Sequence, residues 1–195
     1  MIRIFSYLIV VGVLTGVPML VCAGGERPAS MLSNPCAGCH GTVGASAGYS
    51  IPVIAGLPSK YFRRAMKQYQ SGERYSSIMG RIARGYSDAE IDAMATFFEK
   101  QKWISASRQL DMKMVAQGKK IHEKKCARCH LAQGRYTEYL LPRIAGQWSD
   151  YLAIYLKNAT TSELSIPQPK LMKKSLKGLT EGELAALAQF YATQQ

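Results

Sequence analysis

Apolar side chains recur at helical spacing in two stretches, one in each half of the chain. The first stretch comprises Ile91, Met94, Ala95 and Phe98, and the second comprises Leu184, Leu187, Ala188 and Tyr191. Both sets follow the i, i+3, i+4, i+7 spacing of one helix face. A capping-box pair precedes each stretch: Ser87 with Glu90, and Thr180 with Glu183. In such a pair each side chain satisfies the other residue's free backbone N–H, so the pattern predicts an amphipathic helix in both places.

Further helices are predicted around these two. Residues 60–73 carry apolar side chains at the same spacing, and residues 115–130 form a helical stretch that leads into a pair of cysteines. No stretch shows the alternation of apolar and polar residues that is typical of a strand. Loops rich in Gly and Pro, such as residues 41–52, separate the predicted elements. The chain is therefore predicted to be all-α.

The chain also aligns with itself, which predicts a duplicated architecture. At an offset of 90 the matches are residues 36–40 with 126–130, and residues 54–56 with 144–146; at an offset of 93 they include Met79 with Met172. We predict two copies of one module, residues 24–104 and residues 105–195. A domain of about 80 residues is marginal on its own apolar core, so something else is expected to fill the centre of each module.

The charge of the chain narrows the class of its partners. The 195 residues carry a formal net charge of +12, with 47% hydrophobic and 19% charged residues, a composition typical of globular proteins. The excess of basic residues favours an acidic surface on a partner. These residues are scattered and no nucleic-acid-binding motif accompanies them, so nucleic acid is not expected as a partner.

The first residues predict an export signal. Arg3 is followed by an apolar run over residues 4–21, and Ala23 ends a small-residue cleavage pattern. We predict a signal peptide over residues 1–23, a periplasmic location and no membrane span in the mature chain. The alternative is a permanent membrane anchor, which the two glycines and the proline within the run disfavour. Cleavage removes Cys22 and leaves four cysteines.

These four cysteines lie in two Cys-x-x-Cys-His arrays. The first array is Cys36, Cys39 and His40, and the second is Cys126, Cys129 and His130. A thioredoxin-like redox pair requires a βαβ setting, and a zinc site requires two further ligands, neither of which the sequence predicts. In covalent heme c, two thiols add to the heme vinyl groups and the adjacent imidazole binds iron. We therefore predict two heme c groups, one in each module.

Methionine is predicted to fill the second axial position of each iron. Met79 lies in a glycine-flanked stretch before a helix, and it matches Met172 in the repeat. Met66 and Met94 lie on apolar helix faces, where core packing is the expected role. Filled axial positions favour electron transfer over oxygen or peroxide chemistry, and thioether ligation raises the reduction potential.

Three other residues near the arrays have alternative roles. His122 stands too close to Cys126 on the same helix to reach the far face of a heme, and we expect it at the helix surface. Pro52 and Pro142 each stand twelve residues after the histidine of an array. The carbonyl of each proline can accept the imidazole Nδ1–H and so orient the ring. The alternative is that both are ordinary turn prolines.

Several segments resemble the diheme cytochrome subunits of flavocytochrome c sulfide dehydrogenases. They are "MLSNPCAGCHGT", "SSIMGRIARGYS", "IAGQWSDYL" and "FYATQQ". The resemblance implies two tandem class I cytochrome c domains, each with one heme, in a periplasmic heterodimer. A separate FAD-containing subunit would oxidise sulfide, and electrons would pass through the hemes to a soluble acceptor such as a small cytochrome c. It also implies heme attachment by Cys36, Cys39, Cys126 and Cys129, and iron ligation by His40, Met79, His130 and Met172.

The chain has no G-x-G-x-x-G motif after a strand, so FAD is expected on the partner and no catalytic residue is expected here. Two other functions remain open. A free-standing diheme shuttle to a terminal oxidase or reductase is the second hypothesis. A stable subunit is expected to keep a large apolar face, and a shuttle a small charged rim. A diheme peroxidase requires an open iron position, which the two methionines disfavour.

Overall fold

The computed structural model describes residues 27–106, 109–161 and 166–195. Within these ranges the chain forms helices and loops, and its one β pairing is an isolated bridge between Glu138 and Leu141. The prediction of an all-α fold is confirmed. No helix in the described ranges is long and apolar enough to cross a membrane. The predicted signal peptide, residues 1–23, lies outside the described residues.

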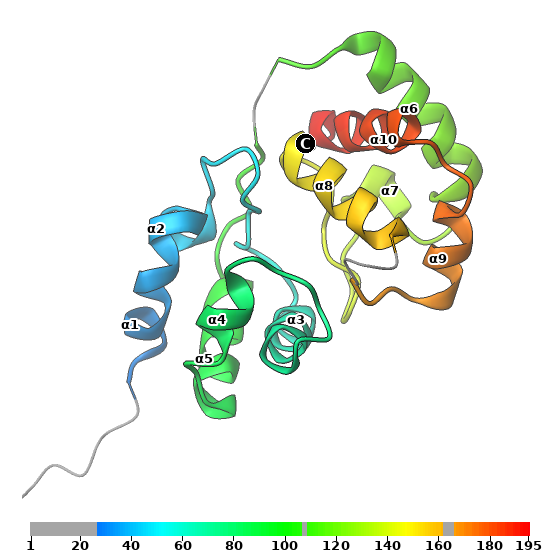
Figure 1. Cartoon of the computed structure of the whole chain (residues 1–195). Coiled ribbons are helices and arrows are strands. Elements are labelled where there is room, and N and C mark those ends of the chain that lie inside the picture. Colours follow the sequence, from blue (N-terminus) through cyan, green and yellow to red (C-terminus); the bar gives the residue numbers. More distant parts are fainter. Residues whose placement is uncertain (1–26, 107–108, 162–165) are drawn as a thin grey trace, which may run out of the picture.

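Two groups of helices follow one another along the chain (Figure 1). The first module comprises α1 (Ala29–Ser33), η1 (Asn34–Cys36), α2 (Ala37–His40), η2 (Thr42–Gly44), α3 (Ser59–Ser71), α4 (Met79–Ala83) and α5 (Asp88–Glu99). The second module comprises α6 (Met112–Lys125), α7 (Leu131–Gly134), α8 (Ser149–Thr160), α9 (Lys170–Leu176) and α10 (Glu181–Thr193). The boundary predicted after residue 104 falls between α5 and α6, and it stays a prediction.

Both predicted capping boxes are present. Ser87 Oγ accepts the backbone N–H of Glu90 at 3.3 Å, and the carboxylate of Glu90 accepts the backbone N–H of Ser87 at 2.8 Å. Thr180 and Glu183 repeat both bonds at the same two distances. The backbone donor lowers the pKa of each glutamate. These pairs explain why α5 and α10 begin one residue after Ser87 and Thr180.

Each module has its own apolar core, built on its last long helix. Helix α1 packs on α5, and α6 packs on α10. The predicted apolar face of α5 is fully buried, together with Leu32, Phe62 and Met66. The face of α10 is buried with Leu152, Leu156 and Leu176. Burial of Met66 and Met94 confirms that these two methionines serve core packing.

Helices α6 and α10 approach closely at Gly118. A Cβ at this position would lie 2.1 Å from the backbone oxygen of Ala186 and 2.7 Å from Cβ of Phe190. Both atoms belong to the rigid part of α10, so the contact has no flexible side chain that can move aside. The absence of a side chain at Gly118 therefore permits the close crossing of the two helices.

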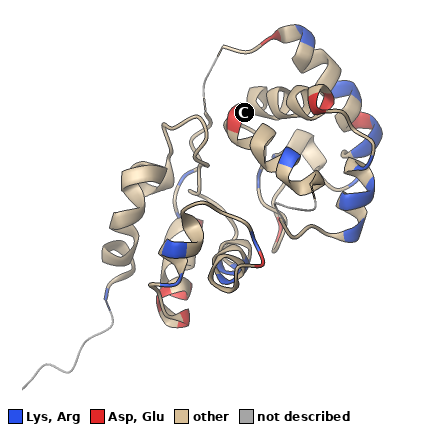
Figure 2. Cartoon of the chain, in the orientation of Figure 1, with Lys and Arg blue, Asp and Glu red and all other residues tan. Residues whose placement is uncertain are grey.

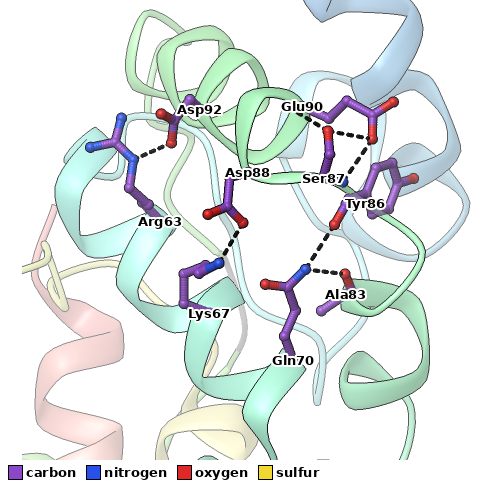
Figure 3. A network of polar contacts seen from close by, with 9 residues as sticks. All are labelled: Arg63, Lys67, Gln70, Ala83, Tyr86, Ser87, Asp88, Glu90 and Asp92. Atoms are coloured by element: carbon purple, nitrogen blue, oxygen red, sulfur yellow. Dashed lines mark hydrogen bonds and ion pairs between the residues drawn. The ribbon is translucent and has the colours of Figure 1, made fainter.

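Polar contacts tie α3 to α4 and α5 (Figure 3). Two exposed ion pairs join α3 to α5: Arg63 with Asp92, and Lys67 with Asp88. Exposed pairs of this kind contribute about 0–1 kcal/mol each. The amide of Gln70 donates to the carbonyls of Ala83 at 3.0 Å and Tyr86 at 2.8 Å. Gln70 thus fixes the end of the short helix that begins with Met79.

A buried glutamine joins the two modules. The side chain of Gln147 accepts the backbone N–H of Val53 at 2.9 Å and donates to the carbonyl of Val53 at 3.0 Å. The adjacent Trp148 donates its Nε1–H to the carbonyl of Ser46 at 3.0 Å. A small apolar cluster surrounds these bonds: Val53, Ala55, Ala106 and Trp148. Directional bonds between buried groups therefore set how one module sits on the other.

Replacing Gly118 with Ala should destabilise the protein by about 1–3 kcal/mol, because the new methyl group overpacks the α6–α10 crossing. The matched control is Gly182→Ala in α10, where a Cβ meets no atom within 4 Å. That change should be neutral or stabilising by up to about 1 kcal/mol, since Gly is a poor helix former. Chemical unfolding of the two holoproteins measures both values, and equal stabilities would contradict the close crossing.

Candidate functional site

The first array lies on a short helical segment at the edge of the first core. Cys36 ends η1 and is half-buried against the core, whereas Cys39 in α2 is exposed. His40 is the last residue of α2, and Gly41 follows it with φ of +72°. A Cβ at Gly41 would lie 2.2 Å from the carbonyl oxygen of Ala45, so only Gly allows the chain to turn back directly after the histidine.

The ring of His40 has a defined orientation. Its Nδ1 lies 2.8 Å from the carbonyl oxygen of Pro52. A carbonyl only accepts, so Nδ1 carries the proton and Nε2 keeps its lone pair for a metal. Burial lowers the pKa of His40, and the bond to Pro52 opposes part of that shift. The role predicted for Pro52 is confirmed, and the imidazole of His40 is neutral.

Met79 lies against the same core as Cys36. It is the first residue of α4 and is half-buried against the first core. Its backbone N–H donates to Oγ of Ser76 at 2.7 Å, which holds the start of the helix. The structure therefore brings one thiol and one thioether of the predicted set to the same apolar core.

The second array has the same relation to the second core. Cys126 follows α6 directly and is half-buried against this core, and Cys129 is exposed. Met172, in α9, packs against the same core as Cys126. Each module thus brings one predicted thiol and one predicted thioether to its own core. None of these four cysteines forms a disulfide.

The environment of His130 differs from that of His40. Nδ1 of His130 is buried and has no hydrogen-bond partner among the described residues. The chain after it turns through Ala132 and Gln133, which both have positive φ. The role predicted for Pro142, accepting this N–H, is therefore wrong. Burial, together with the nearby His122, lowers the pKa of His130 to about 4, so this imidazole is also neutral.

The surface position predicted for His122 is wrong. His122 is only 4% exposed, and its Nδ1 lies 2.9 Å from the hydroxyl of Tyr191. The ring of Tyr191 lies 6.2 Å from that of His130 between centroids. In the first module, the repeat offsets place Leu32 and Phe98 at these two positions. An apolar pair in one copy and a His–Tyr pair in the other is the sequence signal that reveals this contact.

The donor set of each module fits heme c. No group of three or more His, Cys, Asp or Glu residues that would hold a bare metal ion occurs in the part of the chain that the structure describes. Each module instead offers two free thiols, one neutral imidazole and one thioether beside an apolar core. Vinyl addition uses the thiols, and iron accepts the nitrogen and sulfur ligands. Such an arrangement defines a c-type cytochrome with two sites.

Comparison with known proteins agrees with this class. The family model described as Cytochrome c matches residues 115–195. The thiosulfate dehydrogenase electron acceptor of Stutzerimonas stutzeri is 29% identical over 183 residues, covering 87% of this chain and 82% of that protein. The cytochrome subunit of sulfide dehydrogenase of Chlorobaculum tepidum is 42% identical over 73 residues, 37% of this chain and 66% of that protein.

A solved structure shares the fold over most of the chain. Reduced recombinant cytochrome c4 from Pseudomonas stutzeri has a TM-score of 0.77 at 20% identity, covering 89% of this chain and all of that one. The two modules are therefore tandem class I cytochrome c folds. The chain belongs to the cytochrome c family, and it carries two covalently bound heme c groups.

The His122–Tyr191 bond should give a positive coupling in a double-mutant cycle. His122→Leu or Tyr191→Phe alone leaves a buried polar group unpaired, which should cost about 1–3 kcal/mol. The double variant reproduces the Leu32–Phe98 pair of the first module and should recover much of that loss. Unfolding of the four holoproteins measures the cycle, with the exposed Gln117→Leu in α6 as the control. Additive losses would contradict the pairing.

The same cycle has a pH dependence. Burial lowers the pKa of His122 below 6.5, its usual value. The unfolded chain therefore binds a proton that the folded protein resists, and stability falls as the pH drops below that value. The double variant lacks this group, so its stability should fall less between neutral and mildly acidic pH.

Proposed function

We propose that each array attaches one heme and that each iron has one histidine and one methionine ligand. Thioether bonds form at Cys36, Cys39, Cys126 and Cys129, and the iron ligands are His40, Met79, His130 and Met172. This assignment is supported by the packing of Cys36 and Met79 on one core and of Cys126 and Met172 on the other. It is also supported by the neutral imidazole of His40 with its free Nε2.

The chain's own residues then prepare each site for electron transfer. The bound hemes supply one-electron oxidation and reduction at iron. Pro52 orients the ring of His40, and Gln70 fixes the helix that carries Met79. The apolar cores keep water away and lower the local dielectric, so little reorganisation accompanies a change of charge. If His40, Met79, His130 and Met172 hold the two irons as proposed, they would leave no coordination position for an external substrate.

We infer that this diheme cytochrome works in the periplasm and accepts electrons from an FAD-containing sulfide dehydrogenase subunit. The observation that carries this proposal is the 42% identity to the cytochrome subunit of sulfide dehydrogenase. The sequence segments quoted above support it as well. Electrons then leave for a soluble acceptor such as a small cytochrome c.

A second candidate is a free-standing shuttle that serves a different dehydrogenase. Its support is the 29% identity to a thiosulfate dehydrogenase electron acceptor, which extends over 87% of this chain. The two candidates share the diheme electron-transfer chemistry and differ in the donor.

The second module presents a basic surface for an acceptor. Residues 105–195 contain fourteen Lys and Arg and seven Asp and Glu, a net charge of +7. Blue segments gather on α6 and α9 (Figure 2), where the side chain of Lys125 reaches the carbonyl of Ser175 and joins the two helices. The exposed lysines of these helices and of the turn after α9 are Lys113, Lys119, Lys120, Lys124, Lys170, Lys173, Lys174 and Lys177. This surface favours an acidic acceptor whose association slows as salt rises.

Met79→His and Met172→His should each lower the reduction potential of one heme. Replacing a thioether with an imidazole removes a ligand that stabilises reduced iron, and axial ligands together span about 0.8 V of potential. Spectroelectrochemical titration measures the shift, and the sulfur-to-iron absorption band of the oxidised protein should lose about half its intensity. The control is Met112→Leu, because Met112 is 68% exposed. Unchanged spectra in both histidine variants would overturn the ligand assignment.

The donor is identified by isolating the cytochrome from its native cells under mild conditions. A co-purifying flavoprotein, and heme reduction on addition of sulfide, are the expected results. Thiosulfate, added to a separate sample with the whole periplasmic extract, tests the second candidate. Reduction by thiosulfate alone, with no flavoprotein present, would replace the first proposal with the second.

A further inference from the structure

A buried positive charge lies between the two modules, and no anionic partner for it occurs among the described residues. Arg74 follows α3 and is only 6% exposed. Its backbone N–H donates to the carbonyl of Gln68 at 3.0 Å, which fixes the start of this loop to α3. Nε of the guanidinium has no hydrogen-bond partner, and Arg74 forms no ion pair with any residue that the structure describes.

The guanidinium instead lies between aromatic rings of both modules. Its Cζ is 5.1 Å from the ring centroid of Tyr69, in α3, and 5.4 Å from that of Tyr155, in α8. Tyr61 and Tyr151 are its other electrostatic neighbours. Burial raises the pKa of Tyr69, Tyr151 and Tyr155, so these phenols stay neutral and none of them balances the charge.

Aromatic contacts alone do not balance such a charge. Cation–π contacts offset only part of the free-energy cost of burying an ion. A second buried donor, Nε1 of Trp103, also has no partner among the described residues. Trp103 packs against both the first core and the cluster shared by the modules. The boundary between the modules thus carries two buried donors, Arg74 Nε and Trp103 Nε1, that have no acceptor among the described residues.

Heme c supplies the missing kind of group, because its two propionates are carboxylates. We propose that Arg74 binds a carboxylate of the first module's heme at the boundary between the modules, and that it raises the reduction potential of that heme. The first heme is favoured because the loop that carries Arg74 leads directly into Met79. The corresponding position of the second module, at offset 90, is Leu164. Arg74 therefore has no counterpart in the repeat, and its guanidinium is enclosed by tyrosines from both modules.

The proposal makes Arg74 a positioning residue with an electrostatic role. A fixed cation beside a heme carboxylate offsets its negative charge and so favours the reduced iron, which carries one positive charge less. The planar fork of Arg can form two parallel bonds to a carboxylate, which Lys cannot. The charge and the geometry of Arg74 are therefore separable by substitution.

The test uses the full diheme protein and measures both reduction potentials. Arg74→Gln should make reduction of one heme about tenfold less favourable, about 59 mV for one electron, and Arg74→Lys should restore most of that loss. The control is Arg84→Gln, which removes the same charge from an exposed position in the same module. A folded Arg74→Gln protein with two unchanged potentials would overturn the proposal and leave Arg74 a structural cation–π residue.

A second measurement applies if Arg74→Gln does not fold. Arg74→Lys keeps the charge and most of the volume, but it loses the bidentate geometry. The propionate bending vibration in its resonance Raman spectrum should shift from that of the parent protein. An unchanged propionate vibration in Arg74→Lys would overturn the contact with the carboxylate.

Discussion

The small size of each apolar core is the constraint on which the rest of this structure depends. A module of about 80 residues buries too little apolar surface to be stable alone. Each core consists of a few large side chains from its last helix and from the helices that pack on it. A covalently bound heme enlarges that core and links it to the backbone at two points. Binding the cofactor and completing the fold are therefore one process, as in other proteins whose cofactor is part of the core.

The two modules share the positions of their predicted heme-binding residues but differ in the polar groups around them. The capping boxes and the positions of cysteine, histidine and methionine recur in both modules. The histidine environments do not: His40 donates to Pro52, whereas His130 has no partner for Nδ1 among the described residues. A hydrogen bond to the ligand's other nitrogen increases its basicity. The two histidines proposed as iron ligands therefore have unequal surroundings although they occupy equivalent positions in the repeat.

Local signals in the sequence predicted the parts of the structure that depend on neighbouring residues. Helix periodicity and capping chemistry placed α5 and α10, and the repeat paired Met79 with Met172. The errors concern burial and hydrogen bonding that the tertiary structure determines. His122 stands among lysines and a glutamate in the sequence, yet α10 covers it and Tyr191 pairs with it. The sequence around Gln147 also carries no sign that its amide accepts from and donates to the backbone of Val53, 94 positions away.

The junction between the modules has a consequence for electron transfer within the chain. The rate of transfer between two sites depends steeply on their separation, so a fixed separation requires a boundary that does not slide. Gln147 satisfies both the N–H and the carbonyl of Val53, and any displacement along the boundary breaks two buried bonds at once. An apolar contact alone would tolerate such sliding, because dispersion is not directional. Buried polar groups at this boundary therefore give up some stability relative to an apolar core and fix the distance between the two redox centres.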